Sequence, residues 1–280
     1  MDLFIGFDSA WTDNPKAPGA ISALTLQGGR PVRFDAPRLA SFDQALAFIQ
    51  ERRPADGMTL VALDQPTVVP NATSLRPVER AAASLVSWLG GGVQPSNRGR
   101  RGMFCDDSPV WRFLGALGAE EDPERARTAT AGLFLIEVFP ALALASLDPA
   151  FFGRLAAPRY NPARRKTFRT GDWGRVATVA GRGFSELGIE EAVAWCTAAA
   201  AIERPRKADQ DMLDSALCLL IALRWRLKPR KDSLMLGDLA TGYMVTPAST
   251  DVRERLLVKA REHAVPMDGF ILPSSTTPAV

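Results

Sequence analysis

Residues 3–8 (LFIGFD) form a short, nearly all-apolar run that ends in the carboxylate of Asp8. Such a run predicts a strand that is buried on both faces of a sheet. Two later runs repeat the pattern, with an acid at or near the end: 59–64 (TLVALD, with Asp64) and 133–139 (LFLIEVF, with Glu137). We therefore expect three core strands that each carry a carboxylate near the carboxyl end.

The segments between and after these runs predict an α/β fold. Residues 19–26 and 31–37, separated by two glycines, are typical of two antiparallel strands joined by a turn. Apolar residues at helical spacing predict helices elsewhere in the chain, over 41–51, 75–89, 110–117, 141–147, 173–187, 190–202 and 207–227.

The length of 280 residues favours one large domain with additions. We expect the main domain over 1–232, with an insertion at about 90–130, where a glycine cluster and a basic segment interrupt the regular patterns. The rest of the chain, 233–280, is expected to pack on the same domain as a hairpin, a helix and a loose tail, over 234–246, 251–263 and 273–280.

The composition narrows the possible chemistry. Lys and Arg number 34 against 31 Asp and Glu, a net charge of +3 that does not by itself indicate a polyanion partner. Histidine occurs once, at His263, which argues against zinc sites built from several histidines and against relay triads. The three cysteines are widely spaced and suggest neither a disulfide framework nor a thiolate metal site. Any catalysis is therefore expected to use carboxylates.

The sequence also bears on location. No positively charged segment precedes the short apolar run at the N-terminus, and no apolar stretch approaches about 18 residues. We therefore expect neither a signal peptide nor a membrane span, and a cytoplasmic protein.

Two more acids extend the pattern. Asp211 and Asp214 are three residues apart in the predicted helix 207–227 and so share one face. If the three acid-bearing strands are parallel neighbours, their acids meet this helix at the functional edge of the sheet. Such a cluster needs cations, and oxygen ligands favour Mg²⁺ or Mn²⁺. A pair of these ions can activate water and stabilise the leaving oxygen of a phosphodiester.

Each acid also has a structural explanation. An Asp that ends a strand can begin a turn, which suits Asp64 before Gln65-Pro66. Acids in the first turns of a helix favour its dipole, which suits Asp211 and Asp214. Glu137, inside an apolar run, is either functional or salt-bridged. The joint pattern, rather than any one acid, indicates a site.

Four segments resemble one known family: 5–11 (IGFDSAW), 62–66 (ALDQP), 136–144 (IEVFPALAL) and 207–222 (KADQDMLDSALCLLIA). They are similar to the domain-of-unknown-function family 429, regarded as predicted nucleases of ribonuclease H-like fold, over roughly residues 2–227. The resemblance implies a mixed five-stranded sheet in the order 3-2-1-4-5, flanked by helices, with inserted and C-terminal elements. In that order the strands that end in Asp8, Asp64 and Glu137 are adjacent and parallel.

The resemblance also implies roles for the acids. The first-strand Asp of the ribonuclease H-like superfamily corresponds to Asp8, its fourth-strand acid to Asp64, and the acid pair of its final helix to Asp211 and Asp214. Glu137 depends on the narrower family likeness. Two positions depart from the superfamily: Ser215 where alanine is usual, and Ala10 where a glycine often follows the first Asp.

Together these observations predict a hydrolase, a metal-dependent nuclease acting by a two-metal mechanism. Asp8, Asp64 and Asp214 are the expected ligands of Mg²⁺ or Mn²⁺, and Asp211 and Glu137 complete the catalytic set. The expected substrate is nucleic acid or another phosphate ester. Substrate-binding residues are expected in the basic clusters, namely Arg98, Arg100, Arg165, Lys166 and Lys207.

Two other functions share the pattern. A non-catalytic ribonuclease H-like scaffold that binds nucleic acid or a protein would keep the fold and hold no metal. An actin-like phosphotransferase also begins with a strand that ends in Asp, but it needs glycine-rich phosphate turns, and Ser9-Ala10-Trp11 follows Asp8 here. We rank the phosphotransferase below the scaffold.

Overall fold

A five-stranded mixed sheet organises the molecule, in a computed structural model that describes residues 1–16 and 18–270. The strand order is β3-β2-β1-β4-β5, which confirms the predicted order. The strands are β1 (Asp2–Asp8), β2 (Gly19–Gln27), β3 (Arg30–Ala40), β4 (Met58–Leu63) and β5 (Gly132–Glu137). The antiparallel strands β2 and β3 lie on one side of β1, whereas β4 and β5 run parallel to it on the other side.

The two faces of the sheet are covered by different helices. Leu3, Ile5 and Phe7 of β1 pack in one core with α1 (Phe42–Arg52) and α3 (Pro109–Leu117). Phe4 faces the other core, which contains α6 (Thr170–Ser185), α7 (Glu190–Ala200) and the long α8 (Lys207–Leu227). Alternation along a strand therefore decides which helix layer each side chain of β1 meets.

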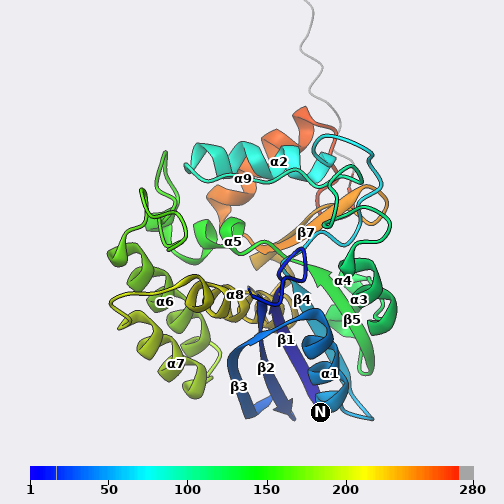
Figure 1. Cartoon of the computed structure of the whole chain (residues 1–280), viewed down its shortest axis with the longest axis vertical. Coiled ribbons are helices and arrows are strands. Elements are labelled where there is room, and N and C mark those ends of the chain that lie inside the picture. Colours follow the sequence, from blue (N-terminus) through cyan, green and yellow to red (C-terminus); the bar gives the residue numbers. More distant parts are fainter. Residues whose placement is uncertain (17, 271–280) are drawn as a thin grey trace, which may run out of the picture.

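Helices α2 (Pro77–Trp88) and α9 (Thr250–Glu262) and the hairpin of β6 (Ser233–Asp238) and β7 (Gly242–Pro247) lie beyond the carboxyl ends of the parallel strands (Figure 1). These elements pack together. The short helices α4 (Pro123–Thr128) and α5 (Pro140–Leu147) flank β5 in the chain. The predicted tail 273–280 lies outside the described residues.

The segment 90–130 is joined to the main domain by core contacts. Phe104, Val110 and Phe113 are buried in the core that α1 forms with the sheet. The C-terminal hairpin is joined as well, because Val138, directly after β5, forms a bridge with Val245 of β7. No helix in ranges 1–16 and 18–270 is long and apolar enough to span a bilayer.

Candidate active site

The ends of β1 and β4 place two carboxylates side by side. Phe7 is in register with Leu63, so Asp8 and Asp64 follow at equivalent positions, and the amide of Asp64 donates to the carbonyl of Phe7 at 2.9 Å. Phe4 and Leu60, each four residues earlier, face the α8 core. Because side chains alternate along a strand, Asp8 and Asp64 extend this same face toward α8.

Helix α8 brings the second pair of acids to this point. Asp211 and Asp214 lie in its first half, and both line one groove with Asp8 and Asp64. Asp8, Asp211 and Asp214 are only 8%, 7% and 6% exposed. Of the five acids that the sequence places at this edge, Asp8, Asp64, Asp211 and Asp214 therefore line one groove, and Glu137 does not.

Close packing of α8 on the sheet sets the depth of these acids. The Ser215 hydroxyl donates to the carbonyl of Gly6 at 3.2 Å and hydrogen-bonds the hydroxyl of Ser22 at 2.9 Å. A Cβ atom at Gly6 would collide with the carbonyl of Ser215 and with Leu219. Glycine in β1 and serine after Asp214 thus hold the helix against the strands.

Polar side chains fix the acids in place. The Tyr160 hydroxyl donates to Oδ1 of Asp214 at 2.8 Å, and Nε2 of Gln210 donates to its Oδ2 at 2.8 Å. The Ser9 hydroxyl donates to Oε1 of Gln65 and so links the turns that follow Asp8 and Asp64. The first two bonds orient the carboxylate of Asp214, and the third connects the turns next to Asp8 and Asp64.

Burial and mutual repulsion disfavour the ionised forms of Asp8, Asp64 and Asp214. Burial, followed by the charges of Asp214 and Asp64, raises the pKa of Asp8 well above its ordinary value. Burial, with the charges of Asp214 and Glu137, also raises the pKa of Asp64. For Asp214, burial raises the pKa to about 6, although Lys207 and the hydrogen bonds from Tyr160 and Gln210 act in the opposite direction.

The cost of ionising Asp214 predicts a pH-dependent effect of Asp214→Asn. In wild type, the stability that protonated Asp214 provides is fully present below the unfolded pKa of 3.8 and is lost as the pH rises through about 6. We therefore compare the free energies of unfolding of the variant and of wild type in chelator. The difference in favour of the variant should increase by about 1–3 kcal/mol as the pH rises from about 4 to about 8. Urea unfolding at several pH values measures this difference.

Asp43→Asn, an exposed acid in the first turn of α1, serves as the matched control. Its free energy of unfolding should follow wild type across the same pH range. A difference between Asp214→Asn and wild type that does not change with pH would contradict the inferred cost of ionising Asp214.

The donor chemistry of the cluster suits a hard divalent cation. Its oxygen ligands are carboxylates, and its excess negative charge is the kind that Mg²⁺ or Mn²⁺ neutralises. Within the described parts of the chain, however, no three His, Cys, Asp or Glu side chains are placed as the ligands of one ion. The Lys207 ammonium instead bonds Oδ1 of Asp211. Its charge also opposes the raised pKa of Asp8 and Asp64.

Two hollows meet at the acids. The acid groove contains Asp8, Lys207 and Asp211 together with the residues that follow β1. The side pocket lies between the C-terminal end of α2, the first turns of α5 and the loop 157–167. Five side chains border both hollows, namely Trp11, Asp64, Gln94, Gln210 and Asp214. The acid cluster therefore lies between an open groove and a neighbouring pocket.

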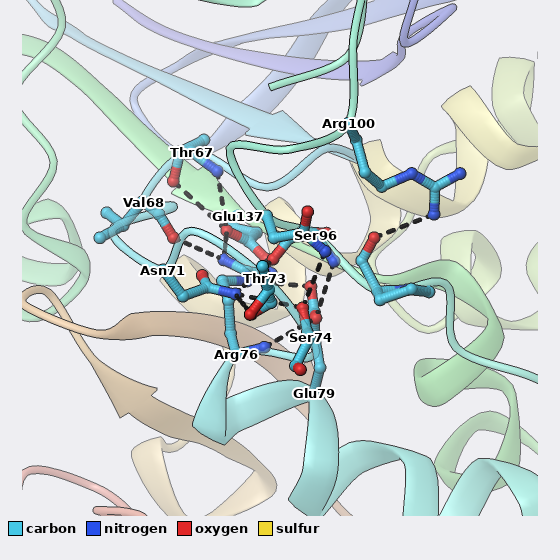
Figure 2. Close-up of polar contacts among 12 residues, drawn as sticks. Thr67, Val68, Asn71, Thr73, Ser74, Arg76, Glu79, Ser96, Arg100 and Glu137 are labelled. Atoms are coloured by element: carbon cyan, nitrogen blue, oxygen red, sulfur yellow. Dashed lines mark hydrogen bonds and ion pairs between the residues drawn. The ribbon is translucent and has the colours of Figure 1, made fainter. Parts of the chain in front are cut away.

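Glu137 belongs to a separate buried network (Figure 2). The Arg76 guanidinium donates to both of its carboxylate oxygens, at 2.6 and 2.9 Å, and to Oε1 of Glu79 at 2.9 Å. The amide of Thr67 and the hydroxyl of Tyr243 complete the surroundings, the latter accepting from the amide of Glu137. Of the two alternatives drawn from the sequence, the salt bridge is present, and a catalytic role for Glu137 stays a prediction.

Strand register explains why Glu137 is set apart. Leu63, not Asp64, is in register with Glu137. The residue that corresponds to Asp64 is therefore Val138, directly after β5, which lies in the α8 core. A difference of one residue directs Glu137 to the opposite face of the sheet.

The predicted substrate-binding residues lie in different places relative to the two hollows. Lys207 lines the acid groove. Arg165 and Lys166 are exposed, in the same loop as Arg164 and Thr167, which line the side pocket. The other two do not line either hollow: Arg98 lies 4.4 Å above the ring of Trp111 and Arg100 donates to the carbonyl of Pro95 at 3.0 Å.

The sequence does not indicate that Gln210, Tyr160 and Arg76 contact the acids. Gln210 carries a readable signal, because it precedes Asp214 by one helical turn. Tyr160 lies in a loop without periodicity, and its partner could not be inferred. Arg76 stands directly before α2 and has the appearance of an ordinary helix-terminal residue.

Comparisons with known proteins give one match. No curated protein matches the chain, and neither does any solved structure. The model of one family matches residues 12–234, which include Asp64, Asp211 and Asp214 and cover most of the chain. The resemblance inferred from the sequence is thereby confirmed at the level of the family. The chain belongs to the family described as "Protein of unknown function (DUF429)".

Proposed function

We propose that the protein is a metal-dependent hydrolase of phosphodiester bonds, a nuclease. The observation that carries the proposal is the meeting of Asp8, Asp64, Asp211 and Asp214 in one largely buried cluster at the carboxyl ends of two parallel strands. Oxygen-rich clusters at this edge of an α/β sheet suit cation-assisted chemistry.

Each group has a distinct role in this proposal. Asp8, Asp64 and Asp214 would hold Mg²⁺ or Mn²⁺, which when bound supplies Lewis-acid stabilisation of the charge that develops on the phosphoryl and leaving oxygens. Tyr160 and Gln210 orient the carboxylate of Asp214. Lys207, about half exposed at the groove, is placed to pair with a phosphate once the acids are neutralised.

The direct test is a cleavage screen with the full chain. Single-stranded, duplex and branched DNA and RNA are incubated with Mg²⁺, with Mn²⁺, or with chelator. We expect cleavage that depends on the divalent ion. The proposal fails if no substrate is cut under any metal condition while the protein is folded by circular dichroism.

One observation favours a second function, that of a non-catalytic scaffold. Lys207 already bonds Asp211, and an internal cation of this kind can make a metal unnecessary. Calorimetric titration with Mn²⁺ separates the two functions. Heat of binding that disappears in Asp8→Asn supports the hydrolase, whereas no response in either protein supports the scaffold.

Lys207→Gln gives a further prediction. Lys207 bonds Asp211, and its charge acts on Asp8, Asp64 and Asp214. Removal of this ammonium group should tighten Mn²⁺ binding about 3- to 10-fold, because one fewer positive charge opposes the ion at close range. The same change should weaken the binding of a phosphodiester substrate. Calorimetry measures the first effect, and fluorescence anisotropy of a labelled oligonucleotide measures the second.

Lys259→Gln on α9 is the matched control, since Lys259 pairs with Glu262 away from the groove. Both affinities should stay at the wild-type value in this variant. Weaker Mn²⁺ binding in Lys207→Gln would mean that the lysine supports the metal site rather than competing with it.

A further inference from the structure

The side pocket has the size and lining of a site for one ring system. Its volume is about 240 Å³, below the roughly 300–1,000 Å³ of pockets for drug-sized ligands. Aliphatic walls come from α2 and α5, and three aromatic side chains also border the space, namely Trp11, Phe139 and Tyr160. Flat apolar groups stack well against such walls.

The polar groups of the side pocket are unevenly placed. Asp64 and Asp214 border both this pocket and the acid groove, whereas Asn161, Arg164 and Thr167 border the pocket but not the groove. An anionic group at the acid end would be repelled. The acid end of the pocket therefore suits a neutral group, and a phosphate would lie over the acids, outside the pocket, only when the divalent ions of the proposed function neutralise them.

Gln210 supplies an independent sign of a ligand. Its side chain borders both hollows and is 7% exposed. Its Nε2 is committed to Asp214, which leaves Oε1 as a buried acceptor that finds no hydrogen-bond donor among residues 1–16 and 18–270. A buried acceptor without a partner is costly, and a ligand N–H would satisfy it.

We propose that the side pocket binds the nucleobase next to the phosphate that the acids address, with an N–H of the base donating to Oε1 of Gln210. This inference rests on the proposed function and adds a substrate class to it. A base can enter a pocket of this size only when it is unstacked and unpaired. The preferred substrates are therefore single-stranded segments, frayed ends or single nucleotides rather than continuous duplex.

The test uses a fluorescent base without phosphate. 2-Aminopurine riboside is titrated into the full-length protein in chelator, and the quenching of its fluorescence reports stacking in the pocket. Because the probe contains no phosphate, its binding does not depend on hydrolysis. A single-stranded pentanucleotide with one 2-aminopurine is then compared, in Mg²⁺, with the same strand in a duplex.

Two variants locate the binding. Ala141 lines the pocket at the start of α5, so Ala141→Trp fills the space and should weaken riboside binding about tenfold or more. The same change at Ala240, an exposed residue in the turn of the β6–β7 hairpin, is the matched control, and Ala240→Trp should bind like wild type. Gln210→Met removes the free acceptor and should weaken binding about 3- to 10-fold. Circular dichroism and urea unfolding confirm that each variant is folded.

The outcomes separate this inference from the proposed function. Saturable quenching that Ala141→Trp removes, together with preference for the single strand, supports the pocket even if no substrate is cleaved. The inference is overturned if the riboside does not bind saturably, or if Ala141→Trp binds it as wild type does. Cleavage of oligonucleotides at an unchanged rate by Ala141→Trp would overturn the pocket and leave the hydrolase intact.

Discussion

Asp8→Asn is expected to abolish metal-dependent cleavage while leaving the metal-free protein as stable as wild type or more stable. The loss should be about 1,000-fold or more, equivalent to about 4 kcal/mol of transition-state free energy. Asp8 lies at the meeting point of the other acids, so the substitution removes an expected ligand charge without changing the shape of the site. Initial rates with Mg²⁺ and Mn²⁺ measure this effect.

The stability half of this prediction follows from the direction of the pKa shift. Burial and the charges of Asp214 and Asp64 raise the pKa of Asp8, so its ionised form destabilises the native state at neutral pH. Melting temperatures in chelator should therefore be unchanged or higher in the variant. A variant that loses activity and also unfolds several degrees earlier would show that Asp8 is a structural group.

Asp43→Asn again serves as the matched control, because it removes one carboxylate from an exposed turn of the same domain. Its cleavage rate and its melting temperature should both equal those of wild type. Equal losses in the two variants would attribute the effect on activity to net charge rather than to the site.

The sequence predicts which acids form this groove because each acid belongs to a clear local pattern. Asp8 and Asp64 follow short apolar runs, and the helix with Asp211 and Asp214 has the bounds 207–227 that its periodicity indicates. Gathering these acids needs only parallel, adjacent strands and one helix that carries two acids on the same face. Helix α4, by contrast, spans six residues, too few to show a helical period.

The position of Glu137 could not be predicted from its own segment. A strand buried on both faces has apolar residues at every position, so its sequence does not reveal which side chains share a face with those of the next strand. Register depends on contacts with β4, and a shift of one residue decides whether Glu137 meets the acids or Arg76. The same limit applies to Tyr160, whose loop has no period at all.

The network around Glu137 predicts the largest effect on stability. In Arg76→Met, the carboxylates of Glu137 and Glu79 would stay buried without their shared cation. The guanidinium is fully buried, and the charges of both acids raise its pKa despite the opposing effect of burial. Loss of one partner from a buried ion pair costs about 3–5 kcal/mol, and we expect a loss of that size here.

The surroundings of Arg76 are tightly packed, so the structure cannot easily rearrange around a different side chain at this position. The Arg76 guanidinium also donates to the carbonyl of Val68 at 3.0 Å. Gly242 of β7 has a φ of 108°, and a Cβ atom there would lie 2.8 Å from Nη1 of Arg76. The strand thus approaches the arginine as only glycine can. A methionine at position 76 would remove a donor from the carbonyl of Val68 and the counter-charge from both acids.

A second substitution separates charge from packing. In the double variant Arg76→Met, Glu137→Gln, one unpaired charge is removed, so at least about 1 kcal/mol of the loss should return. Arg125→Met is the surface control, since Arg125 is 61% exposed and pairs with Glu120, and it should cost less than about 1 kcal/mol. Urea unfolding with an unchanged denaturant slope measures all three.

The same network also links stability to the site. Oε2 of Glu137 accepts from the amide of Thr67 at 2.9 Å, three residues after Asp64. Arg76 therefore supports, through Glu137, the turn that positions a predicted metal ligand. Arg76→Met should weaken Mn²⁺ binding, with partial recovery in the double variant. If Arg76→Met instead unfolds like the surface control, the buried charges must be solvated in solution, and the network cannot be what holds the turn after β4.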